Sequence, residues 1–90
     1  MAEQDVMKHN NMGTAYCALS EMMLSLRHSE TIEDALKISQ SYAGYLKACE
    51  DFGILPQEDI KEMAKNVAMV AELKVKRLER EEKLRRDRNE

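Results

Sequence analysis

Apolar residues in the first third of the chain recur three and four positions apart, which aligns them along one side of an α-helix. Positions 10–14 hold a cluster of residues that weaken helices, so we expect this helix to begin near Thr14. Arg27 and His28 place positive charge in the last turn, where it complements the helix dipole. The apolar stripe consists of Met12, Ala15, Leu19, Met22 and Leu26, and it is widened by Tyr16 and Met23.

A second helix is predicted to begin at Ser29 or Thr31, because either hydroxyl can cap a helix and three acidic residues follow. Its end is marked by Gly53, which suits the left-handed conformation just past a helix, and by Ile54, which can fold back as in a Schellman motif. Small residues inside the stripe, Ser39 and Gly44, are expected to let another helix approach closely. The apolar positions are Ile32, Ala35, Leu36, Tyr42, Ala43, Leu46, Cys49 and Phe52.

A third helix follows Pro56, which is compatible with a first helical turn, and its start carries Glu58 and Asp59. Its stripe consists of Ile60, Met63, Ala64, Val67, Val70, Ala71, Val75 and Leu78. Beyond position 78 the only apolar residue is Leu84, and acids stand four residues before bases, which holds a helix in water without packing. We therefore expect a helical domain at 1–78 and a charged helical extension at 79–90 that projects from it.

The predicted fold is all-α: a three-helix bundle, or a helical hairpin plus one helix, with a long charged C-terminal helix. The chain has only three glycines and one proline, so helix is favoured throughout. A chain of 90 residues buries a modest fraction of its surface, and the apolar stripes are broad. We therefore expect a homodimer.

Charge is divided unevenly along the chain. Residues 1–71 carry six Lys and Arg against eleven Asp and Glu, whereas residues 72–90 carry eight against six. An acidic body of this kind is a poor nucleic-acid binder. The N-terminal residues are acidic where a signal peptide is basic, and no apolar run approaches membrane-spanning length, so we expect a cytoplasmic protein without a membrane partner.

Residues that could carry chemistry are few. Asp5 and His9 lie one turn apart, but a metal or acid–base site needs more ligands than this stretch offers. Cys17 and Cys49 lack a nearby partner and are predicted to be buried free thiols in a reducing compartment, although a bridge between two helices stays open. No glycine stands in a phosphate-binding pattern. We expect no catalytic, cofactor or metal site, and no enzyme.

Two groups of residues are candidates for binding a partner. Met12, Met22 and Met23, with Tyr16 and Tyr45, resemble adaptable apolar contact surfaces, although filling of the core explains them more simply. The other group is a basic cluster in the extension, which acidic residues interrupt; it consists of Lys83, Arg85, Arg86 and Arg88. The leading interpretation is a non-catalytic helical protein-interaction module: an adaptor, a regulatory subunit or a small inhibitor that presents an acidic surface to a basic site. The alternative is a nucleic-acid-associated factor that contacts phosphates through the basic tail.

Overall fold

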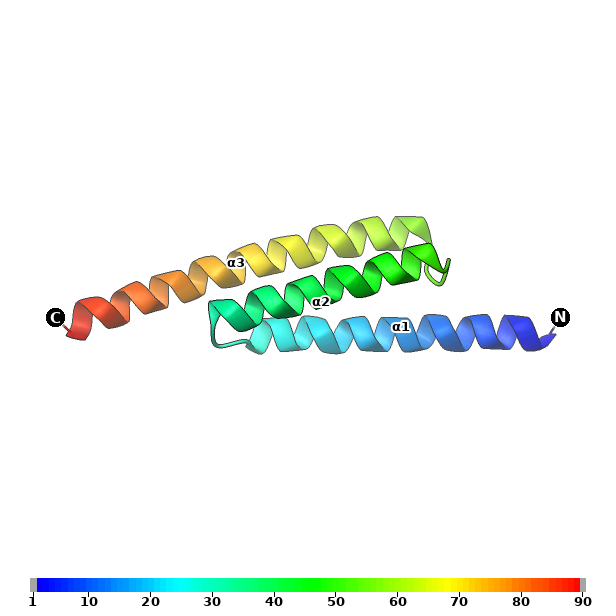
Figure 1. Ribbon diagram of the computed structural model, residues 1–90, viewed down its shortest axis with the longest axis horizontal. Helices are drawn as coiled ribbons and strands as arrows, with labels where there is room; N and C mark the ends of the chain where they lie inside the picture. Colours follow the sequence, from blue (N-terminus) through cyan, green and yellow to red (C-terminus); the bar gives the residue numbers. More distant parts are fainter. Residues whose placement is uncertain (1, 90) are drawn as a thin grey trace.

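Three helices account for almost the whole chain (Figure 1). The computed structural model describes the backbone of residues 2–89 and the side chains of residues 11–88. The helices are α1 (Ala2–His28), α2 (Ile32–Asp51) and α3 (Gln57–Asn89), and each runs antiparallel to the one before it. The described residues contain no strand, which confirms the predicted all-α three-helix bundle.

The expected start of the first helix was wrong. α1 begins at Ala2, and the weak helix formers at positions 10–14 lie inside it. Each such residue costs only a few tenths of a kcal/mol, up to about 1 kcal/mol for Gly13. Nucleation is the costly step of helix formation, and the packed turns around Leu19 supply it, so the helix extends through the weak stretch.

The connection between α1 and α2 uses both candidate capping residues, but for different purposes. Thr31 is the cap of α2, because its hydroxyl accepts a hydrogen bond from the backbone N–H of Asp34 at 3.1 Å. Ser29 is buried, and its hydroxyl donates to the carbonyl of Leu26 at 2.6 Å. Ser29 therefore closes α1 while Thr31 opens α2.

The turn between α2 and α3 has the predicted Schellman geometry. Gly53 has a φ of 63°, and its N–H donates to the carbonyl of Glu50 at 3.1 Å. The N–H of Ile54 donates to the carbonyl of Cys49 at 2.9 Å. These are the two bonds that define the motif, so the end of α2 is confirmed.

The core runs along the line where the three helices meet, and it contains most of the predicted stripes. Several residues differ from expectation, among them Phe52 and Leu36, which are exposed. Cys17 is exposed rather than buried, because it is two residues from both Ala15 and Leu19 and so lies on the opposite side of α1. Gly44 is exposed too, with no heavy atom within 4 Å of the place where a Cβ would stand. The buried apolar residues are Ala15, Leu19, Leu26, Ala35, Tyr42, Leu46, Cys49, Leu55, Ile60, Val67 and Leu78.

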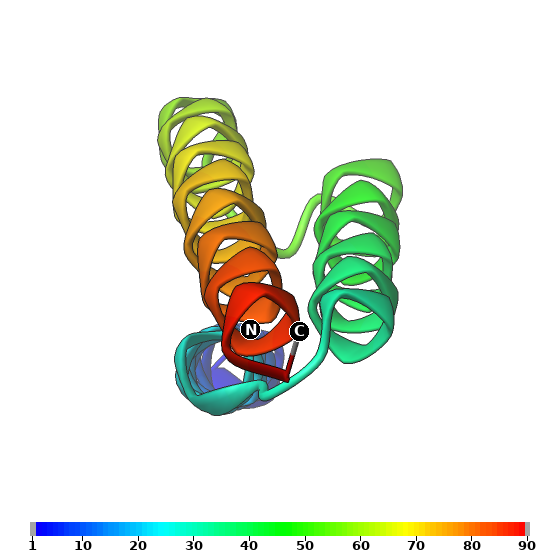
Figure 2. The ribbon, with the colours of Figure 1, turned by 90° about the vertical axis from the view of Figure 1, so that its left-hand side faces the viewer.

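The molecule is a tapered rod with extents of 67 × 18 × 13 Å. α1 runs past the α2–α3 turn at one end, and α3 runs past the α1–α2 connection at the other (Figure 1). Seen end-on, the helices occupy the corners of a triangle, and the contact between α1 and α3 is the smallest of the three (Figure 2). α3 continues beyond Leu78, and Leu84 in this part of the helix is 54% exposed. Within residues 2–89, no helix is both long enough and apolar enough to cross a membrane.

Candidate interaction surfaces

The five apolar residues predicted to bind a partner lie mainly between the helices. All are half-buried and pack against the core, so their first role is to hold the bundle together. Only their exposed edges are free to touch another molecule, and a binding role for them stays a prediction. These residues are Met12, Tyr16, Met22, Met23 and Tyr45.

Tyr16 ties α1 to the start of α3. Its hydroxyl donates a hydrogen bond to Oδ2 of Asp59, which stands in the first turn of α3. This hydrogen bond, followed by desolvation and by the negative charge of Asp59, raises the pKa of Tyr16 above its ordinary value of 10.0. The tyrosine is therefore a protonated structural donor at neutral pH.

A second polar contact joins α3 to the other end of α1. Nζ of Lys74 donates to the backbone carbonyl of Arg27 at 2.8 Å. This carbonyl belongs to the last turn of α1, where backbone acceptors lack helical partners and the helix dipole favours a cation. Lys74 thus caps α1 from a neighbouring helix.

An apolar groove with a volume of about 360 Å³ lies between α2 and α3. Small side chains line much of it, with Ser39 and Ala43 from α2 and Ala64, Ala68 and Ala71 from α3. The floor is apolar and is formed by Leu46, Ile60 and Val67. Our sequence interpretation did not identify this groove, although the spacing of the three alanines in α3 was a usable signal.

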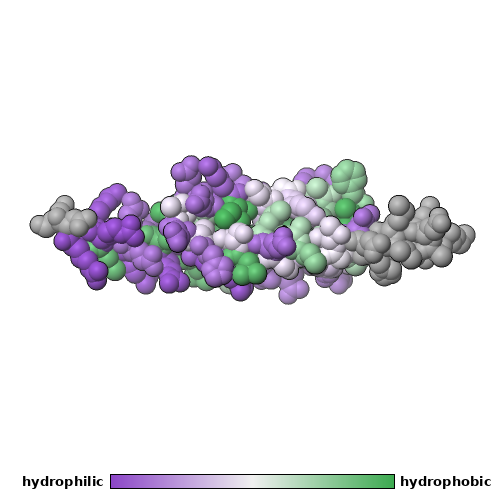
Figure 3. All heavy atoms as spheres, turned by 90° about the horizontal axis from the view of Figure 1, so that it is seen from below, coloured by the Kyte–Doolittle hydropathy of each residue, from purple (hydrophilic) through white to green (hydrophobic). Residues whose placement is uncertain are grey.

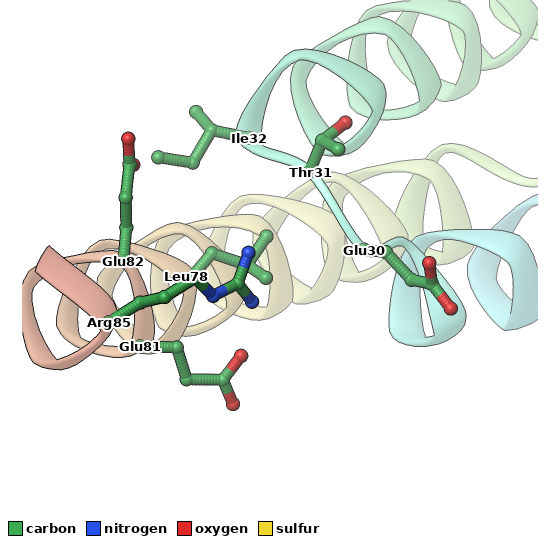
Figure 4. A pocket seen from close by; sticks show the side chains of 7 residues that line it. All are labelled: Glu30, Thr31, Ile32, Leu78, Glu81, Glu82 and Arg85. Atoms are coloured by element: carbon green, nitrogen blue, oxygen red, sulfur yellow. The ribbon is translucent and has the colours of Figure 1, made fainter. Parts of the chain in front are cut away.

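A smaller hollow of about 260 Å³ lies where α3 passes the start of α2 (Figure 4). Ile32 and Leu78 form its apolar part, while Glu81, Glu82 and Arg85 of α3 surround it. Glu82 is held by Arg86 at 3.2 Å in an exposed i,i+4 pair. The carboxylates here are ordinary solvated side chains and form no acid–base constellation.

The basic residues of the tail do not form one surface. Each residue turns about 100° around a helix, so relative to Lys83 the side chain of Arg85 points about 200° away, that of Arg86 about 300° and that of Arg88 about 140°. All four are exposed on α3, and Arg86 is already paired with Glu82. Lys83 and Arg86 therefore share one side of the helix, Arg85 and Arg88 share roughly the opposite side, and acidic residues stand between them.

Large apolar side chains outside the core mark surface that the three helices leave uncovered. Phe52 is 80% exposed, because it is the C-cap residue where the chain turns away from α2, so the expectation that it extends the packed stripe was wrong. Leu36 is 47% exposed and lies on the side of α2 that carries the groove residues. The view from the α1 side shows apolar side chains interspersed with polar ones, and a mostly hydrophilic tail (Figure 3). The full set is Leu24, Leu36, Phe52, Met69, Leu73 and Leu84.

Among the described side chains, no three His, Cys, Asp or Glu residues gather in a way that could hold a metal ion. The side chains of Asp5 and His9 lie outside the described residues. Comparison with protein-family models, with curated proteins and with solved structures finds no match to this chain.

Proposed function

We propose that the chain is a non-catalytic helical protein-interaction module that docks an amphipathic helix of a partner protein in the groove between α2 and α3. The observation that carries this proposal is the apolar groove itself, which is open along two antiparallel helices and lined by small side chains. Small residues let the backbone of a docked helix come close to both α2 and α3, and burial of its apolar side against the apolar floor stabilises the complex. The occupant is a helix because the groove follows the helix axes.

The groove is free to accept a helix because α1 lies elsewhere. Lys74 contacts α1, and Ala68 lines the groove. The two are about 120° apart around α3 at 100° per residue. A docked helix would lie against α2 and α3 on the side away from α1, which gives a four-helix arrangement.

Charge mimicry receives less support than apolar docking. Two of the acids of the body are already paired with lysines one turn away, with Glu33 bonded to Lys37 at 3.2 Å and Asp51 to Lys47 at 3.6 Å. An acidic surface offered to a basic site therefore remains the secondary version of the proposal. The module acts as an adaptor, regulatory subunit or small inhibitor, and it self-associates as a homodimer. Its two free thiols suit a reducing cytoplasm.

The alternative, binding of nucleic acid through the tail, gains nothing from the geometry. Phosphate backbones are followed by basic side chains on one face, whereas those of the tail are divided between opposite sides of the helix. A direct check is binding to a plain DNA duplex at low salt, where phosphate contacts are strongest. We expect no binding there.

The groove is tested with two alanines on the same helix. Ala43 lines the groove, whereas Ala48 is exposed on another side of α2. A photo-reactive side chain placed at position 43 should cross-link a partner peptide in host cells, and the same group at position 48 should not. The cross-linked peptide should map to an amphipathic helix, and Ala68→Arg should abolish the adduct.

Three results would contradict the proposal: equal cross-linking from positions 43 and 48, adducts that map to extended or disordered segments, or an adduct that survives Ala68→Arg. Ala48→Arg serves as the control for an added arginine on an exposed alanine. It should leave the adduct at position 43 unchanged, because position 48 does not line the groove.

A further inference from the structure

The face of α3 that points away from the core carries a stripe of exposed residues. In Figure 2 the other two helices lie on one side of α3, and its opposite side is uncovered. We call the outer stripe the set Glu62, Asn66, Met69, Leu73, Lys76 and Arg80, all of which are exposed. Met69 and Leu73 at its centre are 55% and 60% exposed.

The spacing of the outer stripe is that of a coiled-coil seam. Its members alternate at intervals of four and three residues, which places Asn66, Leu73 and Arg80 at a positions. The remaining three occupy d positions. Residues three and four apart share every face of a helix, so the spacing alone does not indicate a partner. The features that favour one are the two exposed apolar side chains at the centre of the stripe, Met69 and Leu73, which a second helix packed along it would cover.

The order of residue types in the stripe is self-complementary when it is read in reverse. Positions equidistant from Ala71 match: Glu62 with Arg80, and Met69 with Leu73. A second α3 running antiparallel about a two-fold axis at this level therefore places acid against base at both ends and apolar side chains against each other at the centre. Each match occurs twice, as a two-fold interface requires.

The flanking positions on one edge of the seam are complementary as well. In an antiparallel pair, Glu58 comes near Arg86 of the second copy, and Lys65 comes near Glu79, each offset by about 3 Å along the axis. Those four side chains are exposed. Like charges approach at three places: Glu62 comes near Glu79, Lys76 comes near Lys65, and Glu72 comes near its own copy. At the last of these, Lys76 of the same chain already pairs with Glu72 at 3.1 Å.

A parallel pairing of the same face is less favourable because of its charges. In a parallel arrangement each position meets its own copy, so Glu62 would face Glu62, and Lys76 and Arg80 would face themselves. Like charges juxtaposed across an interface oppose association. The complementarity therefore favours the antiparallel direction.

We propose that α3 pairs antiparallel with α3 of a second copy of this chain along the outer stripe, which assigns an interface to the homodimer of the proposed function and rests on it. The overlap from Glu58 to Arg86 extends over roughly 40 Å of helix. Its apolar centre is only two side chains per copy, so the dimer is weak and salt-sensitive. The groove between α2 and α3 faces another direction and stays open in the dimer.

Charge reversal tests the pairing. Glu62→Arg places arginine against Arg80 of the second copy, and Arg80→Glu places two carboxylates together. Each single variant should raise the dissociation constant of the dimer on the order of tenfold, measured by sedimentation of the full chain at low salt. The double variant Glu62→Arg/Arg80→Glu should return to within about threefold of the wild type, because it exchanges the partners.

Controls separate the interface from general charge effects and from folding. Glu21→Arg makes the same charge change on an exposed residue of α1 and should leave the dissociation constant unchanged. Thermal unfolding of each variant at low concentration, where the chain is monomeric, should match the wild type, because the stripe contributes nothing to the core. Equal loss in Glu21→Arg and Glu62→Arg would overturn the proposal.

Cross-linking supplies an independent reading of the register. In a Cys17→Ser background, a mixture of Met69→Cys and Leu73→Cys chains should oxidise mainly to the mixed disulfide dimer. Homodimeric disulfides of Met69→Cys as the main product would indicate parallel pairing and overturn the proposal.

The outcomes also separate this interface from the groove. A chain that stays monomeric at millimolar concentration overturns the pairing and the homodimer, while cross-linking from position 43 still tests helix docking. A dimer that the double variant fails to restore overturns the pairing alone. If Ala43→Arg dissociates the dimer while Glu62→Arg does not, the second copy occupies the groove instead.

Discussion

Gly53 is the residue whose identity is most strongly required by the backbone. Its φ of 63° is unfavourable for residues with a Cβ, yet an added Cβ would meet no heavy atom within 4 Å. Strain in the backbone is therefore the only cost of substitution. We expect Gly53→Ala to lower the free energy of unfolding by about 1 kcal/mol and Gly53→Val by more.

Gly53→Asn is the matched comparison, because asparagine tolerates the left-handed conformation better than alanine. It should cost less than Gly53→Ala in urea-induced unfolding. Equal losses for asparagine and alanine would indicate that something other than the positive φ sets the requirement.

The hydrogen bond from Tyr16 to Asp59 makes a prediction about alkaline pH. Because the folded-state pKa of Tyr16 is raised above 10.0, its contribution to stability is fully present below pH 10 and is lost as the pH rises through the folded-state value. Tyr16→Phe should lower the free energy of unfolding at neutral pH by roughly 1 kcal/mol.

That difference between the wild type and Tyr16→Phe should shrink as the pH rises above 10. The pKa of Tyr42 is also raised, by burial, but Tyr42 is present in both proteins and its effect cancels. The check is urea unfolding of both proteins across the alkaline range. A difference that stays constant with pH would mean that the hydroxyl does not donate to Asp59 in solution.

Burial could be predicted for residues that follow the regular spacing of the apolar stripe. The prediction of burial was wrong where it was based on residue type at a position off that stripe. Leu19, Leu26 and Leu46 lie in the core as the stripes predict. Cys17 was expected to be buried because cysteine usually is, although its position is off the stripe of α1. At such positions the period is the better guide.

At the scale of elements, helix ends could be predicted only where the chain contains a strong signal. α2 ends just before Gly53, whose positive φ reverses the backbone, and α3 follows Pro56. The carbonyl of Pro56 accepts from the N–H of Ile60 at 3.1 Å. The start of α1 has only weak helix formers, which packing nearby overrides. The groove could not be predicted from its alanines, because alanine occurs equally in a core, on a helix surface and at a close contact between helices.

The extension beyond Leu78 should be dispensable for folding. Leu84 is its only apolar residue and is 54% exposed, and its i,i+4 pairs contribute a few tenths of a kcal/mol each. A chain ending at Leu78 should therefore melt within a few degrees of the full protein at low concentration. The same truncation removes Arg80 and should abolish self-association.

The readout is circular dichroism for folding and sedimentation for mass. A truncated chain that unfolds would show that the extension packs against the body. A truncated chain that still dimerises would place the interface away from the outer stripe.

At the scale of the whole molecule, the rod divides into a three-helix middle and two single-helix ends. The polar contacts between helices lie within the middle, with Tyr16 bonded to Asp59 and Lys74 capping α1. An antiparallel dimer through α3 would place the basic tail of one copy beside the acidic start of α3 in the other. The basic end of α3, which packs least within its own chain, would then be stabilised most by the second copy.

Amide hydrogen exchange along α3 should show this gradient. Exchange is slow where opening requires unfolding of the core and fast where a helix has no packed neighbour. At low concentration, amides around Val67, which is buried, should exchange slowest, and those beyond Leu78 fastest. At concentrations where the dimer forms, protection should rise beyond Leu78 in the wild type but not in Glu62→Arg. Uniform protection along α3 at low concentration would instead mean that the tail is packed within a single chain. In that case the tail would be helical without a second copy, and pairing through the outer stripe would not be needed to stabilise it.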